Sequence, residues 1–422
     1  MTELKFDVAI AGGGLAGLTA AYALAKKGVN VALLERGSYP GSKNVCGGIF
    51  YPVILKKLIP EYRSEAPIER LVSKRSFHLM AGEACFSFEF SLPTECFTVL
   101  RAKFDRWFAG KVEEAGATII CETLVEDVIR RDGRAVGVKT DRGEIASNLV
   151  IIADGAPSLL AEKLGLRKPS KPNRFVLGVK EVISLPEEEV ERRFNLSREE
   201  GAALIFYGEP LTKQASGFIY TNRESLSVGV ASYLHQLARL QENPNQLLEE
   251  FKRAKAVAPL VKGGTIKEYS AHLIPESYEG ELYGEGVLVA GDAAGLLNSS
   301  PLFLEGTSLA MASGLTAAEV SLEALERGDY SKRFLSKYER MLNDSFVLKD
   351  VKRYRRFPEF LERYSDMLAD YPRMFGEFLA QIYSADERPK EDKVKEAFAR
   401  LGGKIGLLKA LLFLLKLWRS TL

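Results

Sequence analysis

The chain has 422 residues with almost balanced charge, because 58 Lys and Arg stand against 56 Asp and Glu and give a formal net charge of +2 at pH 7. This balance argues against nucleic acid as the main partner. The length exceeds the size at which one core keeps growing, so two intertwined domains are expected. The four cysteines have no CxxC or Cys/His spacing, and no metal site is expected.

No targeting or spanning segment is expected either. The first apolar run already begins at Phe6, which leaves no room for a signal peptide and predicts a cytoplasmic protein. No run of about 18 uncharged apolar residues predicts a helix that crosses a membrane.

The first forty residues predict a dinucleotide-binding unit. An apolar strand, Phe6 to Ala11, runs into the pattern Gly12-Gly13-Gly14-Leu15-Ala16-Gly17, which opens a helix. In such a pattern Gly12 permits the tight turn, Gly14 lets the backbone approach a pyrophosphate, and Gly17 lets the helix pack on its strand. The helix N-terminus adds free N–H groups and a positive dipole end.

A second apolar strand, Val31 to Leu34, ends at Glu35. This acid follows the glycines by about 20 residues, the spacing at which a carboxylate accepts the ribose hydroxyls of an adenosine. The glycine-rich loop from Arg36 to Gly48 is too polar for a core, and Gly47 and Gly48 allow backbone to lie against a flat ring, which favours a flavin.

The next hundred residues predict strands of a second domain and then further elements of the first domain. Short alternating runs between Tyr51 and Thr98 indicate antiparallel strands of a second domain, followed by a helix from Val99 and a strand at 117–120. Strands at 124–129 and 135–140 flank an Asp132-Gly133 turn, and a buried strand at 148–153 ends at Asp154-Gly155.

The second half predicts a pocket sheet and then helices. Residues 170–285 alternate with period two, and a buried strand at 286–290 leads to Gly291-Asp292. An aspartate there can bind the ribitol chain of FAD, and the helix that opens near Gly306 points its positive end at the isoalloxazine carbonyl. Beyond Leu325 we expect only helices.

The predicted fold class is therefore α/β (α+β): a Rossmann-like FAD-binding domain, an interleaved antiparallel-sheet substrate domain and a helical C-terminal region. The expected FAD-binding parts are 1–75, 99–165 and 286–330. The expected substrate-domain parts are 76–98 and 166–285, followed by helices at 331–400 and an amphipathic tail at 401–422.

Several stretches carry a family resemblance. The glycine-rich start, Arg101 to Asp105, Asp154-Gly155 and Gly291-Asp292 resemble the FAD-binding fold of aromatic hydroxylases and their relatives. The stretches 178–186, 217–221, 271–276 and 345–350 resemble the FixC-like branch of the electron-transfer flavoprotein:quinone oxidoreductase family. The resemblance extends over nearly the whole chain.

The resemblance implies that one FAD takes electron pairs from a reduced electron-transfer flavoprotein and passes them to a membrane quinone. Larger family members resemble this chain but carry a four-cysteine iron–sulfur module, whereas no cysteine follows Cys121 here. Any cluster is thus expected in a separate ferredoxin-like subunit. The expected cofactor-binding residues are Gly12, Gly14, Ala16, Gly17, Glu35, Arg36, Lys43, Cys46, Gly47, Gly48, Arg101, Val125, Asp154, Gly155, Gly291, Asp292, Gly306 and Thr307.

Two other functions stay open. Cys46-Gly47-Gly48 resembles the geranylgeranyl reductases, which hydrogenate prenyl chains, although Phe218 to Thr221 lacks the Trp and Pro of their pocket sheet. The chain could also be an electron-relay and docking subunit without a soluble substrate. A hydroxylase is disfavoured, because no aromatic-acid clamp is recognisable.

The expected catalytic residues are few, since a flavin needs mainly a shaped pocket and a proton supply. His272 and Tyr269 are candidates to donate a proton or hydrogen bond to a quinone carbonyl, and Tyr220 is a third. A packing role is the alternative for each of them.

The tail predicts peripheral attachment to a membrane. Residues 402–422 are rich in leucine, and Lys409, Lys416 and Arg419 fall on one side of a helix that also carries Trp418. Such a helix can lie in a bilayer surface, although docking onto the core or a partner is the alternative. We expect it at the inner face of the cell membrane, where a quinone or prenyl lipid is collected.

Overall fold

The computed structural model describes residues 5–43, 47–91, 93–156, 158–168, 175–211, 215–275, 280–298, 305–355, 363 and 366–402. The chain divides into two compact units. Unit 1 comprises Met1–Glu69, Glu95–Val176 and His272–Arg355, and unit 2 comprises Arg70–Thr94, Leu177–Ala271 and Arg356–Leu422.

The sheet of unit 1 has a parallel centre. Its strands follow the order β16-β17-β10-β1-β2-β7, where β16 is Tyr283–Gly284, β17 is Val287–Val289, β10 is Gly143–Ile152, β1 is Lys5–Ala11, β2 is Val31–Leu34 and β7 is Thr118–Ile120. The five strands from β17 to β7 run parallel. Strands buried on both faces read as continuous apolar runs, and the ends of these strands have that character.

An antiparallel hairpin continues this sheet beyond β10. It consists of β8 (Val125–Arg131) and β9 (Arg134–Thr140). Asp132 and Gly133 both have positive φ, as a two-residue turn between twisted strands requires. The predicted turn is confirmed.

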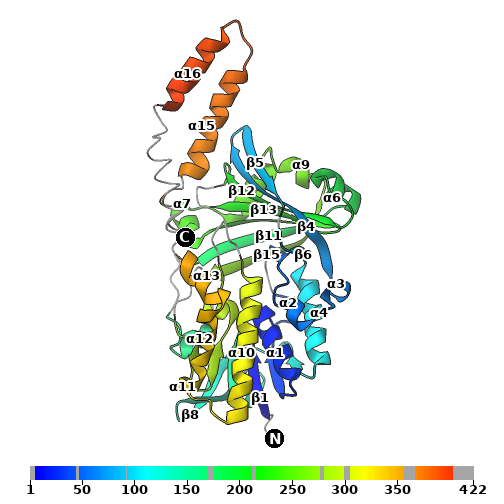
Figure 1. Cartoon of the computed structure of the whole chain (residues 1–422), viewed down its shortest axis with the longest axis vertical. Coiled ribbons are helices and arrows are strands. Elements are labelled where there is room, and N and C mark those ends of the chain that lie inside the picture. The colour runs from blue at the N-terminus through cyan, green and yellow to red at the C-terminus, as the bar shows by residue number, and fades with distance from the viewer. Residues whose placement is uncertain are drawn as a thin grey trace. The chain divides into compact units, whose positions relative to one another are not determined.

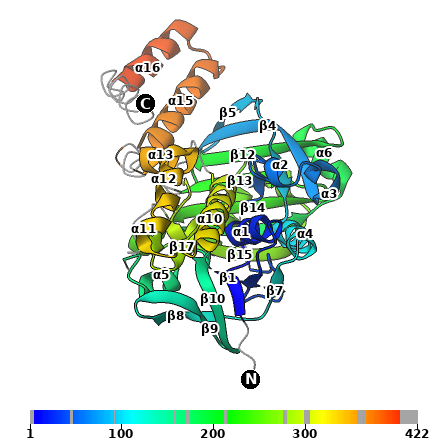
Figure 2. The same ribbon diagram turned by 60° about the horizontal axis from the view of Figure 1, so that its bottom comes forward.

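Two helices cross unit 1 side by side, α1 (Leu15–Ala25) and α10 (Thr307–Arg327) (Figure 2). Their backbones approach closely, because a Cβ on Gly314 of α10 would collide with the carbonyl oxygen of Ala16 on α1. The other elements of unit 1 are β3 (Ile49–Phe50), α2 (Leu55–Leu58), α3 (Tyr62–Glu65), β6 (Phe97–Val99), α4 (Arg101–Glu114), α5 (Leu159–Lys163), the 3₁₀ turn η2 (Gly291–Ala294), α11 (Lys332–Leu335), α12 (Lys337–Asp344) and α13 (Phe346–Tyr354).

Unit 2 is built on a second sheet, of order β15-β11-β14-β13-β12-β4, with β5 paired to β4 (Figure 1). The strands are β4 (Ile68–Ala81), β5 (Ala84–Phe90), β11 (Phe175–Ser184), β12 (Glu200–Gly208), β13 (Ser216–Thr221), β14 (Ser225–Tyr233) and β15 (Thr265–Pro275). The ends of β4, β11 and β15 cross the division between the units.

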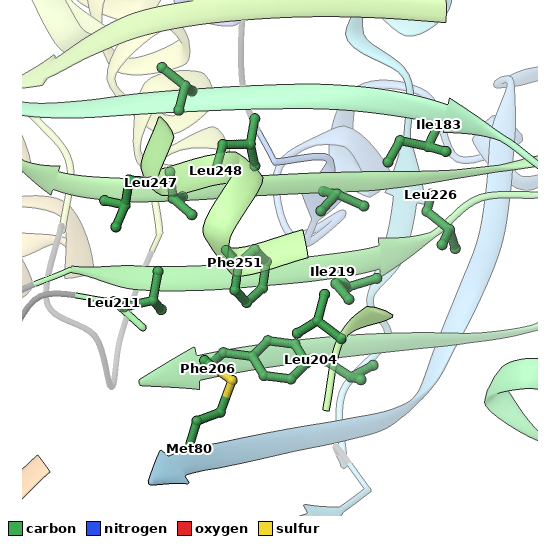
Figure 3. Close-up of a cluster of buried hydrophobic side chains, with 14 of the residues drawn as sticks. Met80, Ile183, Leu204, Phe206, Leu211, Ile219, Leu226, Leu247, Leu248 and Phe251 are labelled. Carbon is green, nitrogen blue, oxygen red and sulfur yellow. The ribbon is translucent and has the colours of Figure 1, made fainter. Parts of the chain in front are cut away.

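One face of this sheet carries a hydrocarbon core, which includes Leu204, Phe206, Ile219 and Val230 from the strands and Phe251 from a helix (Figure 3). The helices of unit 2 in this region are α6 (Glu187–Phe194), α7 (Leu234–Leu240), α8 (Pro244–Arg253) and α9 (Ala258–Val261). Gly217 is required there, since a Cβ would run into the ring of Phe251.

The described chain ends in a helical hairpin of α15 (Asp366–Tyr383) and α16 (Lys390–Gly402), which lie side by side (Figure 1). Phe378 of α15 meets Phe398 of α16 edge to face, with ring centroids 5.0 Å apart. Lys393 is fully buried at the turn, where its ammonium contacts the Asp386 carboxylate at 2.7 Å.

The predicted fold class is confirmed, with differences in detail. Residues 55–65 form the short helices α2 and α3 rather than strands, and helices α6 to α9 interrupt the expected sheet of residues 170–285. Strand β4 pairs in parallel with β12, although antiparallel pairing was expected. Parallel pairing needs a long connection, and the chain passes through unit 1 between these two strands. The chain enters unit 2 at Arg70, within β4.

Candidate functional site at the carboxyl ends of the unit 1 strands

The three glycines after β1 have separate structural reasons. Gly12 has φ +110°, and a Cβ there would collide with the carbonyl oxygen of Ala153 at the end of β10. A Cβ on Gly17 would collide with the carbonyl oxygen of Gly12. A Cβ on Gly14, by contrast, meets no described atom within 4 Å. The protein itself therefore leaves space at Gly14, where the fingerprint expects a pyrophosphate.

Glu35 is fixed by backbone. Its Oε2 accepts from the N–H of Gly13 at 2.9 Å, and its Oε1 accepts from the N–H of Gly37 at 2.6 Å. Each carboxylate oxygen retains a second lone pair. The side chain is held across the Gly-rich turn and remains able to accept ribose hydroxyls, which stays a prediction.

Asp154 follows the end of β10, next to the same turn. Its Oδ1 is buried and has no hydrogen-bond partner among the described residues, while its Oδ2 accepts weakly from the N–H of Leu160 at 3.4 Å. Burial raises the pKa of Asp154. A buried acceptor of this kind is costly unless a ligand satisfies it.

Asp292 lies in η2, directly after β17. The turn is anchored because Gly291, with φ +65°, donates its N–H to Ser313 Oγ of α10 at 2.9 Å. The same helix begins at Thr307, with Gly306 at its N-cap, as expected.

Arg167 connects two of these loops and was not found by sequence reasoning. Its buried guanidinium donates to the carbonyl oxygens of Ala156 at 2.9 Å and of Ala293 at 3.2 Å. It thereby ties the loop after Asp154 to the turn that holds Asp292. A single arginine in a polar stretch gives no periodic or motif signal, so nothing in the sequence could single it out.

The pKa of His272 is set by burial and by nearby charged side chains. Burial lowers the pKa of His272, and the Asp292 carboxylate acts in the opposite direction, while Arg101 and Arg36 reinforce the lowering. Burial likewise raises the pKa of Asp292 against the charges of His272, Arg101 and Arg167. The charges of Arg36 and Arg101 therefore act on His272, and those of Arg101 and Arg167 act on Asp292.

Arg101 opens α4 and is held by its own helix. Its Nε and one terminal nitrogen donate to the two oxygens of Asp105, both at 2.7 Å, and the Asp105 side chain is fully buried. A bidentate pair of this kind fixes the guanidinium plane. The loop after Glu35 packs here too, because a Cβ on Gly41 would come within 2.8 Å of Asp105 Cβ.

The remaining expected cofactor residues are placed less specifically. Ala16 is buried in α1, Arg36 and Lys43 are exposed, Gly47 and Val125 are half-buried, and Gly48 has φ +112° and accepts from the N–H of Val99 at 2.8 Å. Gly155 has φ +84°. Cys46 lies outside the described residues.

The structure does not bring the three catalytic candidates together. Tyr269 and His272 are three residues apart on β15 and so project from opposite faces of the strand. Tyr269 is 50% exposed, and its hydroxyl donates to Asn245 Oδ1 of α8 at 2.5 Å. This hydrogen bond gives Tyr269 a structural role in joining the sheet to a helix. Tyr220 is buried on β13 of unit 2, with its ring 4.9 Å from that of Phe218.

These features fit FAD. The open space at Gly14, the unpartnered Asp154 Oδ1 and the backbone-fixed Glu35 lie on loops that follow three neighbouring parallel strands, at the edge where such sheets bind nucleotides. The described residues contain no group of three or more His, Cys, Asp or Glu placed to hold a metal ion.

Comparison with known proteins agrees with this assignment. Residues 7–92 match the FAD dependent oxidoreductase family, and residues 357–422 match the ETF-QO/FixC family C-terminal domain. The chain is 41% identical to Protein FixC of Bradyrhizobium diazoefficiens, over 99% of this chain and 100% of that protein. It is 39% identical to Protein FixC of Escherichia coli K12, over 97% of each.

Solved structures share the fold. A geranylgeranyl bacteriochlorophyll reductase-like protein from Thermoplasma acidophilum superposes with a TM-score of 0.72 at 23% identity, covering 94% of this chain and 96% of that one. The flavin-dependent brominase Bmp2 has a TM-score of 0.66 at 18% identity, over 95% and 100%. At such identities the likeness concerns the fold alone. The full-length match to FixC proteins goes further: the chain belongs to the FixC branch of the electron-transfer flavoprotein:quinone oxidoreductase family and is an FAD-dependent oxidoreductase of electron transfer.

Proposed function

We propose that the protein takes electron pairs from a reduced electron-transfer flavoprotein, directly or through a separate ferredoxin-like subunit, and delivers them to a membrane quinone. The observation that carries this proposal is the match of residues 357–422 to the ETF-QO/FixC C-terminal domain. The FAD-binding fold recurs in enzymes of many chemistries and cannot select a substrate, whereas the C-terminal match is specific to this family.

FAD, when bound, supplies the two-electron storage that links donor to acceptor. The chain's own residues position and insulate it. The Gly12-to-Gly17 turn and the start of α1 would hold the pyrophosphate through N–H groups, and Glu35 would accept the ribose hydroxyls. Asp154 and Asp292 would accept from hydroxyl groups farther along the cofactor.

The proton supply in this proposal is His272. Because burial and two neighbouring arginines lower its pKa, the imidazole is neutral near pH 7 and can both donate and accept a proton. Asp292 opposes this shift and would stabilise the imidazolium once His272 takes up a proton. His272 and Asp292 can therefore balance the change in charge when electrons reach the cofactor.

We also propose peripheral attachment to the inner face of the cell membrane. No helix among the described residues is long and apolar enough to cross a bilayer. The tail at 402–422, nearly all of it outside the described residues, supplies leucines, four basic residues and Trp418. The adjoining α15–α16 hairpin exposes the apolar rings of Phe375 and Phe398, which is in keeping with such attachment.

Anaerobic titration tests the proposal. The FAD-loaded full chain is reduced with a stoichiometric chemical reductant, and a short-chain 1,4-benzoquinone is added while the flavin spectrum is followed. We expect the oxidised flavin bands to return with one quinone per flavin. Return of the bands with a prenyl alkene but not with the quinone would instead establish a prenyl reductase, and no return with either would indicate a relay subunit.

A further inference from the structure

The segment from α11 to α13 carries a strong local positive charge. Residues 332–355 contain eight Lys and Arg against three Asp and Glu, a net charge of +5, whereas the whole chain has +2. The rest of the chain is therefore net negative. Lys332 and Lys337 are paired with glutamates of other elements. Of the other six cations, three lie on α13 and a fourth directly follows it.

Helix α13 has two sides of different chemistry. Its buried side chains are all apolar: Val347, Leu348 and Val351. Its exposed side chains, here called the basic face, are Phe346, Lys349, Lys352 and Arg353. At about 100° per residue, these four share one side of the helix within an arc of about 120°. Asp350 is the only acid of α13, and it is half-buried at the edge of this face.

No carboxylate pairs with the basic face within the part of the chain that the structure describes. Lys349 donates to the carbonyl oxygen of Asp344 at 2.7 Å, and Lys352 donates to the amide oxygen of Asn343 at 2.6 Å. Both acceptor groups are neutral, so the positive charges are not compensated by them. Lys349 and Arg353 are moreover four residues apart, and like charges at this spacing destabilise a helix.

Other helices of the chain place opposite charges at the same spacing. Helices α4, α6 and α16 do so in the pairs Arg101–Asp105, Arg193–Glu189 and Lys395–Glu391. The helix dipole favours cations in a last turn, which accounts for Lys352 and Arg353 but not for Lys349 in the middle of α13. Local stability therefore gives no reason to collect these like charges on one face.

The basic face is connected to the cofactor site through α10. Helix α13 contacts both α12 and α10 (Figure 1). The first residues of α10, Gly306 and Thr307, are expected to bind FAD, and Ser313 of α10 anchors the turn that carries Asp292. A protein bound to α13 would thus lie beside an element that supports the cofactor-binding loops.

We propose that the basic face docks an electron-donor protein whose surface carries clustered carboxylates. Complementary charges steer such a partner to its site and fix its orientation, and Arg and aromatic side chains are enriched where proteins meet. A bilayer fits less well, because a helix in a membrane surface needs an apolar side in the acyl boundary, and the apolar side of α13 is buried in the protein. This inference rests on the proposed function and deepens it.

Salt-dependent binding and electron transfer test the inference. The probe is a small acidic [2Fe–2S] ferredoxin. Calorimetry measures the dissociation constant of its oxidised form from the FAD-loaded full chain, and anaerobic stopped flow measures the rate at which its reduced form reduces the flavin. At low ionic strength we expect Lys349→Gln, Lys352→Gln and Arg353→Gln together to weaken binding and slow flavin reduction about tenfold or more. Raised salt should remove the difference from the wild type.

The matched control is Arg130→Gln, Arg131→Gln and Lys139→Gln together. It removes the same number of charges from exposed positions on the β8–β9 hairpin of the same unit. We expect it to change binding and rate by less than about twofold. Gln is nearly as good a helix former as Lys and Arg. FAD content and the thermal unfolding midpoint are measured for each variant, and Lys349→Gln alone repeats the test if the triple variant does not fold.

The outcomes separate docking from the proposed function. If the basic-face variant binds the ferredoxin as well as the wild type does, or if the control loses binding equally, the docking surface is refuted. If the variant loses binding to phosphatidylglycerol liposomes but not to the ferredoxin, the face meets lipid and the inference is refuted too. The quinone titration uses a chemical reductant and needs no docked donor, so its failure with the wild type, despite intact ferredoxin binding, would refute the proposed function alone.

Discussion

At the scale of single residues, the three glycines of one motif have different functions. Gly12 and Gly17 are demanded by the fold, because their Cβ positions are occupied by backbone oxygens of Ala153 and Gly12. Gly14 faces open space within the protein. Steric contact with the described residues gives no reason for glycine at this position, whereas the approach of a pyrophosphate does.

We expect Gly14→Val to give a folded but colourless protein. A Cβ at this position meets no described atom within 4 Å, yet a branched side chain fills the space where the pyrophosphate approaches the backbone. Flavin absorbance at purification and thermal unfolding of the FAD-free protein measure the two effects. Gly17→Val is the matched comparison and should unfold or destabilise the protein by several kcal/mol, because it overpacks the helix against its strand. A yellow Gly14→Val protein with full FAD content would refute the cofactor site.

Asp154 should destabilise the FAD-free protein at neutral pH. Burial raises the pKa of the Asp154 carboxyl group in the folded state above the ordinary 3.8. The folded protein therefore keeps its full stability below pH 3.8 and loses stability as the pH rises through the raised pKa, because the buried carboxyl group then has to ionise. We therefore expect Asp154→Asn to raise the unfolding midpoint of the FAD-free protein at pH 7, with a smaller gain near pH 4. An equal or lower midpoint at pH 7 would show that the carboxylate is satisfied within the protein.

Residues at strand ends were predictable, whereas isolated buried ions were not. Glu35, Asp154 and Asp292 each follow an apolar run, and parallel strands bring their carboxyl ends to one edge. Arg167 acts by bridging two carbonyl oxygens far apart in sequence, and the burial of Lys180 depends on strand pairing. Neither property has a local sequence signal. Tyr269 and His272, which were separate candidates, project from opposite faces of β15, because residues three apart on a strand face opposite ways.

At the scale of elements, the contact between α1 and α10 positions the cofactor-binding loops. Gly314 lets the helices touch at Ala16, and Ser313 beside it accepts from the N–H of Gly291. Helix α10 therefore supports both the glycine-rich turn and the turn that carries Asp292. The sequence predicted both helices, but this contact needs the tertiary structure.

Gly314→Val should loosen FAD as well as the fold. Its side chain would collide with the Ala16 backbone and separate the two helices, at a cost of about 1–3 kcal/mol. Chemical denaturation and the FAD dissociation constant measure the two effects. The control is Gly110→Ala in α4, which has no described atom within 4 Å of its new Cβ and should stabilise the helix by roughly 0.5–1 kcal/mol. Unchanged FAD affinity in a destabilised Gly314→Val protein would separate the helix contact from the site.

Secondary structure was predicted correctly where its signal lies in neighbouring residues of the sequence. The Asp132-Gly133 turn fixes its hairpin, and apolar runs fix β1, β2 and β17. Helices α2, α3 and α9 have only four residues each, too few for a helical period to show, and they are held by tertiary contacts. The direction of β4 relative to β12 follows from the path of the chain through unit 1, which no local pattern records.

At the scale of the whole molecule, the proposed function requires access to lipid and to protein partners. We expect the full chain to sediment with anionic liposomes and a chain lacking residues 403–422 to remain in solution with its FAD bound. The leucines and basic residues of the tail supply the attraction. Raised salt should weaken the binding of the full chain. Equal sedimentation of the shortened chain would assign the tail to subunit packing instead.

Anaerobic electron transfer from donor to acceptor through this protein is the decisive test of the proposed function. Reduced electron-transfer flavoprotein and a quinone are mixed on anionic liposomes, with and without the ferredoxin-like subunit, and the rate of quinone reduction is followed. We expect quinone reduction that requires the FAD-loaded protein and disappears with the Gly14→Val protein. If the wild-type protein leaves the flavoprotein reduced and the quinone oxidised with every partner present, the proposed function is refuted.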